Sequence, residues 1–248
     1  MDHLLYLAMS GAKENMNSLT LRSNNLANAN TVGFKADLEQ ARAMQAFGDG
    51  LPSRVFSMTE RPGQSFAQGG LMTTGRDLDV AVEGDGWLTV QDAQGGQAYT
   101  RMGNLQLSPY GVLQTSNGLN VLDDAGQPIV LPLPLEKISI NKDGTIVGRP
   151  EGAAPNGMEE FQRIKLVNPD IRSVDKGNDG LFRRKDGQAE PASADVKLVS
   201  GALEASNVNV VDEMTNLIRL QRQFETQVKM MQTAQKNDEA HTQLLRLS

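Results

Sequence analysis

The chain has 248 residues, a net charge of −6 at neutral pH and no cysteine. The absence of cysteine excludes disulfide bonds, thiolate metal sites and cysteine nucleophiles, and the negative charge argues against a nucleic-acid-binding face. Hydrophobic residues make up 39% of the chain and aromatic residues only 4%, which indicates a thin core with much surface left for polar contact or subunit packing.

The amino-terminal residues lack the pattern of a secretory signal. Asp2 stands where such signals carry positive charge, and the apolar run over residues 4–9 is short. No stretch approaches the roughly eighteen apolar residues that a membrane-spanning helix needs. These rules alone predict a soluble protein that stays inside the cell and does not insert into a membrane.

A helix is expected over residues 2 to about 30, within an N-terminal segment that spans residues 1–35. One face of this helix repeats at alternating four- and three-residue spacing, which is the a/d pattern of a coiled-coil seam. The seam positions are Leu5, Met9, Ala12, Met16, Leu19, Ser23 and Leu26. An asparagine-rich stretch over residues 24–30 should end the helix, because Asn competes for backbone hydrogen bonds and tolerates left-handed geometry.

Residues 36–75 are expected to form an extended connector. Its first part, residues 36–47, is compatible with a short helix that carries Leu38, Ala41 and Met44 on one face. From Gly48 to Gly75 the composition shifts to Gly, Pro, Ser and Thr without a sustained period. A connection of this length without its own periodicity is uncommon in a compact domain and indicates a functional segment.

Residues 76–200 are expected to form a β domain. Apolar and polar residues alternate there, and turn residues such as Gly, Asp and Asn interrupt the alternation about every ten positions. This pattern predicts an antiparallel, hairpin-rich domain. The expected strands include residues 78–82, 87–90, 99–101, 138–140, 145–147, 161–167 and 196–198.

The C-terminal segment, residues 201–248, is expected to contain a closing helix over residues 207 to about 245. Asn207 or Asn209 suits the N-cap, and Asp212 and Glu213 would complement the helix dipole in the first turn. This helix also carries an a/d seam, which needs a partner helix to bury it. The seam positions are Val210, Met214, Leu217, Gln221, Phe224, Val228 and Met231.

These elements together predict a mainly β protein with terminal α-helices. The N- and C-terminal helices are expected to form a coiled-coil core, and the antiparallel, hairpin-rich β domain is inserted between them. Such a chain has the organisation of an assembly subunit, because its two apolar seams can be buried only against each other or against neighbouring subunits.

The sequence shows no catalytic, cofactor-binding or metal-binding pattern, and we expect no enzyme and no cofactor. The two histidines, His3 and His241, lie near opposite termini. Asp77 and Asp79 are expected on a solvated strand face, and Trp87 is expected to anchor the β core. A glycan-binding or glycan-cleaving β protein stays open as the alternative, although few aromatic residues are available to hold a sugar.

Four stretches resemble, in order, conserved segments of the bacterial flagellar axial proteins, the family that includes the rod proteins. The first, SNNLANANTVGFK at residues 23–35, resembles the rod signature, with Val32 in place of the Thr or Ser often found there. The others are LDVAVEGDGWLTV (78–90), YTRMGNLQLSPYGVLQTSNGLNVL (99–122) and GALEASNVNVVDEMTNLIRLQRQFE (201–225). The signature residues carried over are Asn24, Asn25, Leu26, Ala27, Asn28, Gly33 and Phe34.

This resemblance implies a structural component of the flagellar basal-body rod that transmits motor torque. It implies copies of the chain and other rod proteins as partners, and transit through the flagellar type III export apparatus, which uses no cleaved signal. The expected location therefore changes from the cell interior to the rod, which spans the periplasm. The opening MDHLLYLAMSGA and the length are most similar to the proximal rod protein, with the distal rod protein as the alternative.

Overall fold

The computed structural model describes the chain except for residues 1, 46–54, 153, 155–156 and 248. The side chains of residues 2–5, 7, 40–45, 55–62, 238 and 241–247 are not described either. The chain divides into two compact units. We call the first the helix–hairpin unit (Met1–Ala29, Ala36–Ser65 and Val208–Ser248) and the second the β unit (Asn30–Lys35 and Phe66–Asn207).

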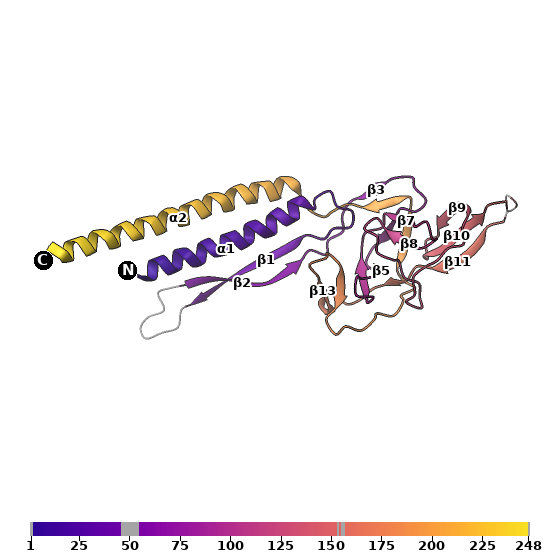
Figure 1. Cartoon of the computed structure of the whole chain (residues 1–248), viewed down its shortest axis with the longest axis horizontal. Coiled ribbons are helices and arrows are strands. Elements are labelled where there is room, and N and C mark those ends of the chain that lie inside the picture. Colours follow the sequence, from indigo (N-terminus) through magenta and orange to yellow (C-terminus); the bar gives the residue numbers. More distant parts are fainter. Residues whose placement is uncertain (1, 46–54, 153, 155–156, 248) are drawn as a thin grey trace. The chain divides into compact units, whose positions relative to one another are not determined.

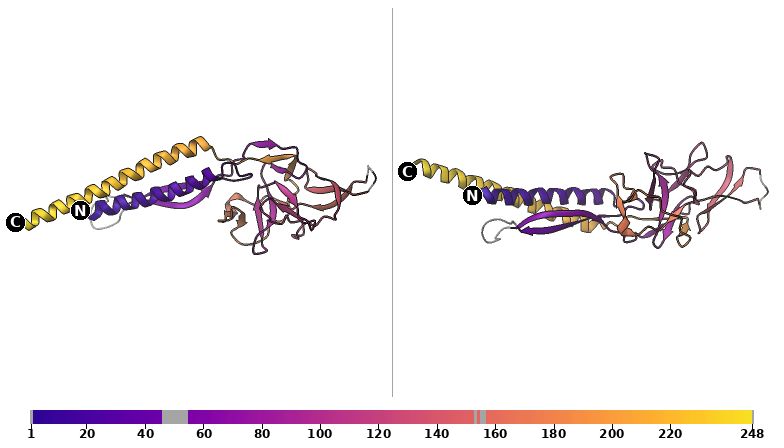
Figure 2. Two further views of the ribbon diagram at one scale, coloured as in Figure 1. Left: turned by 45° about the horizontal axis from the view of Figure 1, so that its top comes forward. Right: turned by 90° about the horizontal axis from the view of Figure 1, so that it is seen from below.

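The helix–hairpin unit consists of two long helices and one β-hairpin. Its elements are α1 (Asp2–Ala27), β1 (Asp37–Gln45), β2 (Val55–Gln64) and α2 (Val210–Leu247). Helix α1 lies between α2 on one side and the β1–β2 hairpin on the other (Figure 1). The two helices run antiparallel, and the further views in Figure 2 also show them side by side.

The ends of the two helices follow the sequence signals. The amide N–H of Asn28 donates to the carbonyl of Asn24 at 3.1 Å in the last turn of α1. At the start of α2, Asn209 Oδ1 accepts from the N–H of Val211 at 3.0 Å. The prediction that Asn209 caps this helix is therefore confirmed, and the acidic residues of the first turn lie near the positive end of its dipole.

One expectation about the connecting segments is wrong. The short helix expected over residues 36–47 is strand β1 over Asp37–Gln45, because this segment pairs antiparallel with β2 and its backbone bonds go to that partner. Residues 46 and 47 lie outside the described residues. Before the closing helix, a strand occupies Ala202–Glu204, and α2 begins at Val210, directly after its cap Asn209.

The β unit contains the remaining strands, all of them paired antiparallel. They are β3 (Leu71–Thr73), β4 (Val80–Glu83), β5 (Trp87–Gln91), β6 (Gln97–Thr100), β7 (Leu105–Leu107), β8 (Leu113–Thr115), β9 (Leu135–Ile140), β10 (Thr145–Pro150), β11 (Glu159–Arg163), β12 (Leu166–Val167), β13 (Val174–Lys176), β14 (Phe182–Arg184), β15 (Lys197–Ser200) and β16 (Ala202–Glu204). The 3-10 turn η1 spans Ile171–Ser173.

These strands form several small sheets rather than one large one. The largest has the order β12-β5-β6-β14-β13, and a three-stranded sheet has the order β11-β10-β9. Two-stranded pairs β15-β4, β16-β3 and β7-β8 complete the unit. Sequence-adjacent strands pair in β5–β6, β7–β8 and β9–β10, as the regular spacing of turn residues predicts.

The core of the β unit is aliphatic, with a separate aromatic cluster. Strand residues such as Val80, Leu88 and Ile146 belong to one continuous buried group. Trp87 lies in the second group with Tyr99 and Phe182, and its ring centroid is 4.5 Å from that of Phe182. Trp87 therefore anchors a core, as expected, although it is not the main one.

The observed fold is mainly β with a helix near each end, which agrees with the predicted class. A coiled-coil core between subunits is a statement about an assembly and stays a prediction. Among the described residues, no helix is both long enough and apolar enough to cross a membrane.

Candidate assembly face and signature segment

The contact between α1 and α2 includes small and polar residues. A Cβ atom added to Gly11 would lie 2.9 Å from Nε2 of Gln227, so the two helices approach each other closely at this level. Ala8, Ala12 and Asn15 of α1 are buried along the same part of the helix. Small side chains permit close helix packing, because they leave room for the two backbones to approach each other.

The predicted assembly positions are divided between buried and exposed faces. Ala12 is buried, and the side chains of Leu19, Leu26, Leu217, Phe224, Val228 and Met231 are partly buried. Met9, Met16, Val210 and Met214 are exposed, as are the polar seam positions Ser23 and Gln221. The side chain of Leu5 lies outside the described residues.

The packed face inside the chain therefore overlaps the predicted seam only in part. On α2, the buried residues Glu213 and Ala234 and the partly buried Phe224 lie along one face at combinations of three- and four-residue spacing. On α1, the corresponding face contains Ala8 and Asn15 rather than the methionines. The predicted seam included Ala12 and Phe224 of this face, but a search for apolar residues passes over Asn15 and Glu213.

Asn25, the second asparagine of the signature, joins three elements of the helix–hairpin unit. Its side chain is fully buried. Its Nδ2 donates to the carbonyl of Asp37 at 2.9 Å, and its Oδ1 accepts from the N–H of the same residue at 2.9 Å. Nδ2 also lies 3.3 Å from Oε1 of Glu213, which accepts from Arg22 at 3.0 Å. The amide thus ties α1 to the start of β1 and to the first turn of α2.

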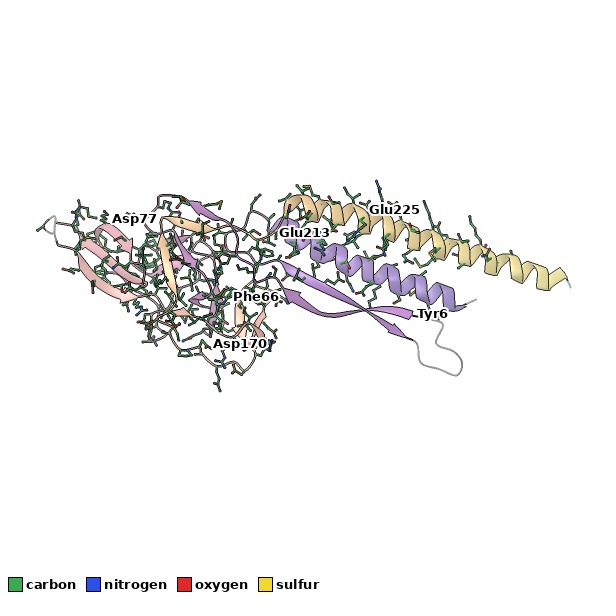
Figure 3. The ribbon with its side chains drawn as sticks, turned by 180° about the vertical axis from the view of Figure 1, so that it is seen from behind. Tyr6, Phe66, Asp77, Asp170, Glu213 and Glu225 are labelled. Carbon is green, nitrogen blue, oxygen red and sulfur yellow. The ribbon has the colours of Figure 1, made fainter. Side chains whose placement is uncertain are left out.

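The other asparagines of the signature finish the helix. Asn28 Nδ2 donates to the carbonyl of Asn24 at 2.9 Å, so this carbonyl accepts both the backbone N–H and the side-chain amide of Asn28. Asn24 and Ala27 are exposed, and Leu26 is partly buried. Figure 3 shows Glu213 at the start of α2, close to the end of α1 where these residues lie.

Gly33 occupies a place in the β unit that no larger residue fits. Its φ is +67°, a conformation that L side chains rarely adopt. A Cβ atom here would lie 2.3 Å from the carbonyl carbon of Arg101. The N–H of Gly33 donates to the carbonyl of Glu204 at 2.8 Å. The signature therefore requires glycine both for the backbone conformation and for this close approach.

The next two residues of the signature are held by one lysine of β13. The Nζ of Lys176 lies 4.0 Å from the centroid of the Phe34 ring, within the range of a cation–π contact. The same Nζ donates to the carbonyl of Lys35 at 2.8 Å. The partly buried Phe34 thus packs against a cation and not only against apolar residues.

Lys35 ends the signature in a buried ionic network. Its Nζ lies 2.7 Å from Oε1 of Glu204, whose Oε2 lies 2.9 Å from Nη1 of Arg101. The side chains of these three residues are 1%, 2% and 4% exposed, respectively. Lys35 also donates to the carbonyl of Ala67, and the N–H of Gly69 donates to Glu204. One carboxylate therefore compensates two buried cations.

The network shifts the pKa of its members. Burial lowers the pKa of the Lys35 ammonium below its ordinary value, although Glu204 acts in the opposite direction. Burial by itself would raise the pKa of Glu204. The hydrogen bond from Lys35 and the charge of Arg101 outweigh it and hold the pKa of Glu204 below its ordinary value. Glu204 is therefore ionised at neutral pH.

Among the described residues, no group of three or more His, Cys, Asp or Glu side chains could hold a metal ion. Asp77 is exposed as expected, but the expectation that Asp79 is solvated is wrong. Asp79 is buried, because it lies inside the β unit and pairs with Arg76 at 3.4 Å. The side chains of His3 and His241 lie outside the described residues.

Three regions of the chain match families of flagellar proteins. Residues 5–35 match the family described as "Flagella basal body rod protein". Residues 81–148 match "Flagellar hook protein FlgE/F/G D1 domain", and residues 199–244 match "Flagellar basal body rod FlgEFG protein C-terminal". Each region contributes one member of the buried network, namely Lys35, Arg101 and Glu204.

Curated relatives align with the chain over nearly its whole length. "Flagellar basal-body rod protein FlgF" of Salmonella typhimurium is 40% identical over 254 aligned residues, covering 100% of both chains. The chain belongs to the flagellar basal-body rod protein family. The FlgF protein of Caulobacter vibrioides is 37% identical over 93% of both chains. "Flagellar basal-body rod protein FlgG" of Bacillus subtilis is 31% identical, over 93% of this chain and 94% of its own.

The family assignment confirms the resemblance drawn from the four conserved stretches. This rod protein is a structural component of the flagellar basal body, and membership of the family implies assembly with other rod proteins. Within the chain, two signature residues lie at the centre of buried polar contacts. Asn25 hydrogen-bonds to Asp37 of β1 and Glu213 of α2, and Lys35 forms a buried ion pair with Glu204 inside the β unit.

Proposed function

We propose that this chain is a subunit of the proximal rod and that its helices pack with those of neighbouring subunits into a coiled-coil core. The core carries motor torque along the rod, while the β unit contributes a folded body at each subunit. Copies of the chain and other rod proteins are its neighbours. The chain reaches the rod through the flagellar type III export apparatus.

One observation carries this proposal. Among the described side chains of the helix–hairpin unit, every buried apolar residue is an alanine: Ala8, Ala12, Ala36 and Ala234. The larger apolar side chains of the same unit include an exposed set: Tyr6, Met9, Met16, Leu38, Val210, Val211, Met214, Ile218 and Met230. A unit that exposes its large apolar residues gains stability when other subunits cover them.

The proximal position is supported by the relatives. The FlgF proteins of Salmonella typhimurium and Escherichia coli align with the whole chain at 40% and 39% identity. The FlgG protein of Bacillus subtilis aligns less closely, at 31%. The distal rod is therefore the second candidate position within the same structure.

The test uses substitutions in the helix seam of the full chain, expressed in a motile strain that lacks its own copy. Leu19→Asp and Phe224→Asp place a charge at partly buried positions of α1 and α2. We expect both variants to be missing from purified basal bodies and to abolish swimming. Thr20→Asp and Thr226→Asp, at the exposed neighbouring positions, should keep both.

The fluorescence of Trp87, the single tryptophan, shows whether the β unit of each variant is folded. A folded β unit in a chain that is missing from basal bodies places the defect in the helices. Normal swimming by either seam variant would contradict the proposed core. Swimming of the deletion strain without any copy of the chain would contradict the rod function itself.

A further inference from the structure

Helix α1 carries an apolar stripe on the side away from both of its partners within the chain. Met9 and Met16 lie seven residues apart, or about two helical turns, and therefore share one face. Tyr6 lies on the same face, one turn before Met9, near the amino-terminal end of α1 (Figure 3). We call Tyr6, Met9 and Met16 the α1 stripe.

Helix α2 carries a matching stripe near its start. Val211 and Ile218 are also seven residues apart, and Met214 lies between them on the same face. We call these three residues the α2 stripe. Each of the six side chains in the two stripes is between 50% and 70% exposed. Neither stripe is covered within the chain, although large apolar side chains in water are costly.

We propose that the α1 stripe of one copy docks on the α2 stripe of a second copy, with Met9 against Ile218 and Met16 against Val211. This inference rests on the proposed function and names the contact by which copies meet. Copies stacked in a rod point in the same direction, so α1 of one copy runs antiparallel to α2 of the next. The equal seven-residue spacing lets both pairs form at once in that orientation.

The docked alignment predicts a stagger between neighbouring copies. Within one chain Gly11 lies level with Gln227. In the docked contact Gly11 would lie level with Asn216 of the second copy, which is eleven residues nearer to the start of α2. At 1.5 Å per residue the two copies are offset by roughly 16 Å along the helices. Because the stripes are different surfaces, the contact repeats in an open series and does not close a dimer.

The size of the stripes fits such a repeated contact. Six side chains of this kind, each about half exposed, offer on the order of 700 Å² in total. A stable pairwise complex buries roughly 1,200 Å² or more. Two isolated copies would therefore separate readily, whereas a copy held by several neighbours at a growing end would stay. The methionines suit this role, because they adapt to uneven surfaces.

The absence of cysteine allows a direct test by disulfide cross-linking. The full chain carrying Met9→Cys with Ile218→Cys is expressed in the deletion strain, and purified basal bodies are oxidised. A disulfide needs Cα atoms about 4.4–6.8 Å apart. Within one chain the two positions are separated by roughly 16 Å along the helices, so only two copies can be joined. We expect a ladder of covalent dimers, trimers and longer products, and the same for Met16→Cys with Val211→Cys.

A matched control keeps one cysteine and shifts the other. Met9→Cys with Val211→Cys is out of the proposed register by seven residues, or about 10 Å, and should give no ladder. Cross-linking of Met9→Cys alone to itself would overturn the proposal, because it shows a symmetric contact. A product with a different rod protein instead of a second copy would also overturn it. The proposal would also be overturned if a strain swims, its basal bodies contain the double-cysteine variant, and oxidation still gives no ladder.

Those results would overturn the proposed contact without contradicting the rod function, so failure of this inference is distinguishable from failure of the proposed function. If a cysteine pair prevents incorporation, a charge pair tests the same register. Met9→Lys and Ile218→Glu should each reduce swimming, and the double variant should restore it at least partly. A double variant that swims no better than either single variant would overturn the proposed contact.

Discussion

The two units of this rod protein bury opposite kinds of residue. The β unit encloses large aliphatic and aromatic side chains in two clusters. In the helix–hairpin unit, the described buried side chains are alanines, asparagines and one glutamate. The β unit therefore gains stability from its own apolar core, whereas the helix–hairpin unit leaves several large apolar side chains exposed, and we propose that partner subunits cover them.

Each unit nevertheless contains a buried polar cluster tied to the signature. In the β unit the cluster is ionic, because Glu204 lies between Lys35 and Arg101. In the helix–hairpin unit the central group is the neutral amide of Asn25. Removing one partner from a buried ion pair costs more than losing a neutral hydrogen bond, so perturbations of the two clusters should differ in size.

The largest effect is expected from Glu204→Gln. The substitution leaves Lys35 and Arg101 buried without a compensating charge, and it should lower the free energy of unfolding of the β unit by about 3–5 kcal/mol. Urea denaturation followed by the fluorescence of Trp87 reports on this unit alone. Glu83→Gln at an exposed position of β4 is the control. A loss no larger than that of the control would show that the network does not stabilise the unit.

The pH dependence of the same carboxylate should be the next largest effect. The pKa of Glu204 is lower in the folded protein than its ordinary value of 4.5. Its contribution to stability is therefore complete above that value and is lost as the pH falls through the lower, folded pKa. The difference in urea midpoint between the natural chain and Glu204→Gln should narrow below about pH 4. A constant difference from pH 7 to pH 3 would contradict this assignment.

Gly33→Ala should destabilise the β unit more than Gly75→Ala. Both glycines have a positive φ, +67° and +73°, so alanine adds backbone strain of about 1 kcal/mol at each. Only at Gly33 does the added Cβ meet other atoms, 2.3 Å from the carbonyl carbon of Arg101, while Gly75 has open space. Thermal unfolding of the two variants measures the difference. Equal losses would mean that the backbone near Arg101 moves aside without cost.

Asn25→Ala should have the smallest effect of the four and should act on the helix–hairpin unit alone. The variant loses the hydrogen bonds of one neutral amide to Asp37 and Glu213, at a cost of about 1 kcal/mol. Faster hydrogen exchange in α1, with unchanged Trp87 fluorescence, is the expected result. Asn24→Ala, at the exposed neighbouring position, should show the same hydrogen exchange in α1 as the natural chain. Unfolding of both units together would contradict the separation drawn between them.

Residue patterns predicted much of this fold. Periodicity placed helices near both ends, and the turn residues predicted a hairpin-rich β region between them. The β1–β2 hairpin could not be predicted, because neither strand has a clear alternation of apolar and polar residues. The two strands form because their backbone groups hydrogen-bond to each other. The signature pointed to the correct segment but gave no role to Asn25 or Lys35, since their partners Glu213 and Glu204 are 188 and 169 residues away.

The sequence by itself determined the family, the secondary structure at both ends and the presence of apolar residues at helical spacing. Only the tertiary structure decided which helix faces meet, because helix packing depends on how closely two backbones approach. Gly11 and Ala12 are small enough to let the two helices approach, and the amide of Asn25 hydrogen-bonds to Glu213 of α2. Met9 and Met16 lie on the exposed side of α1. A spacing pattern records where apolar residues lie on one helix, and it contains no information about which neighbour covers them.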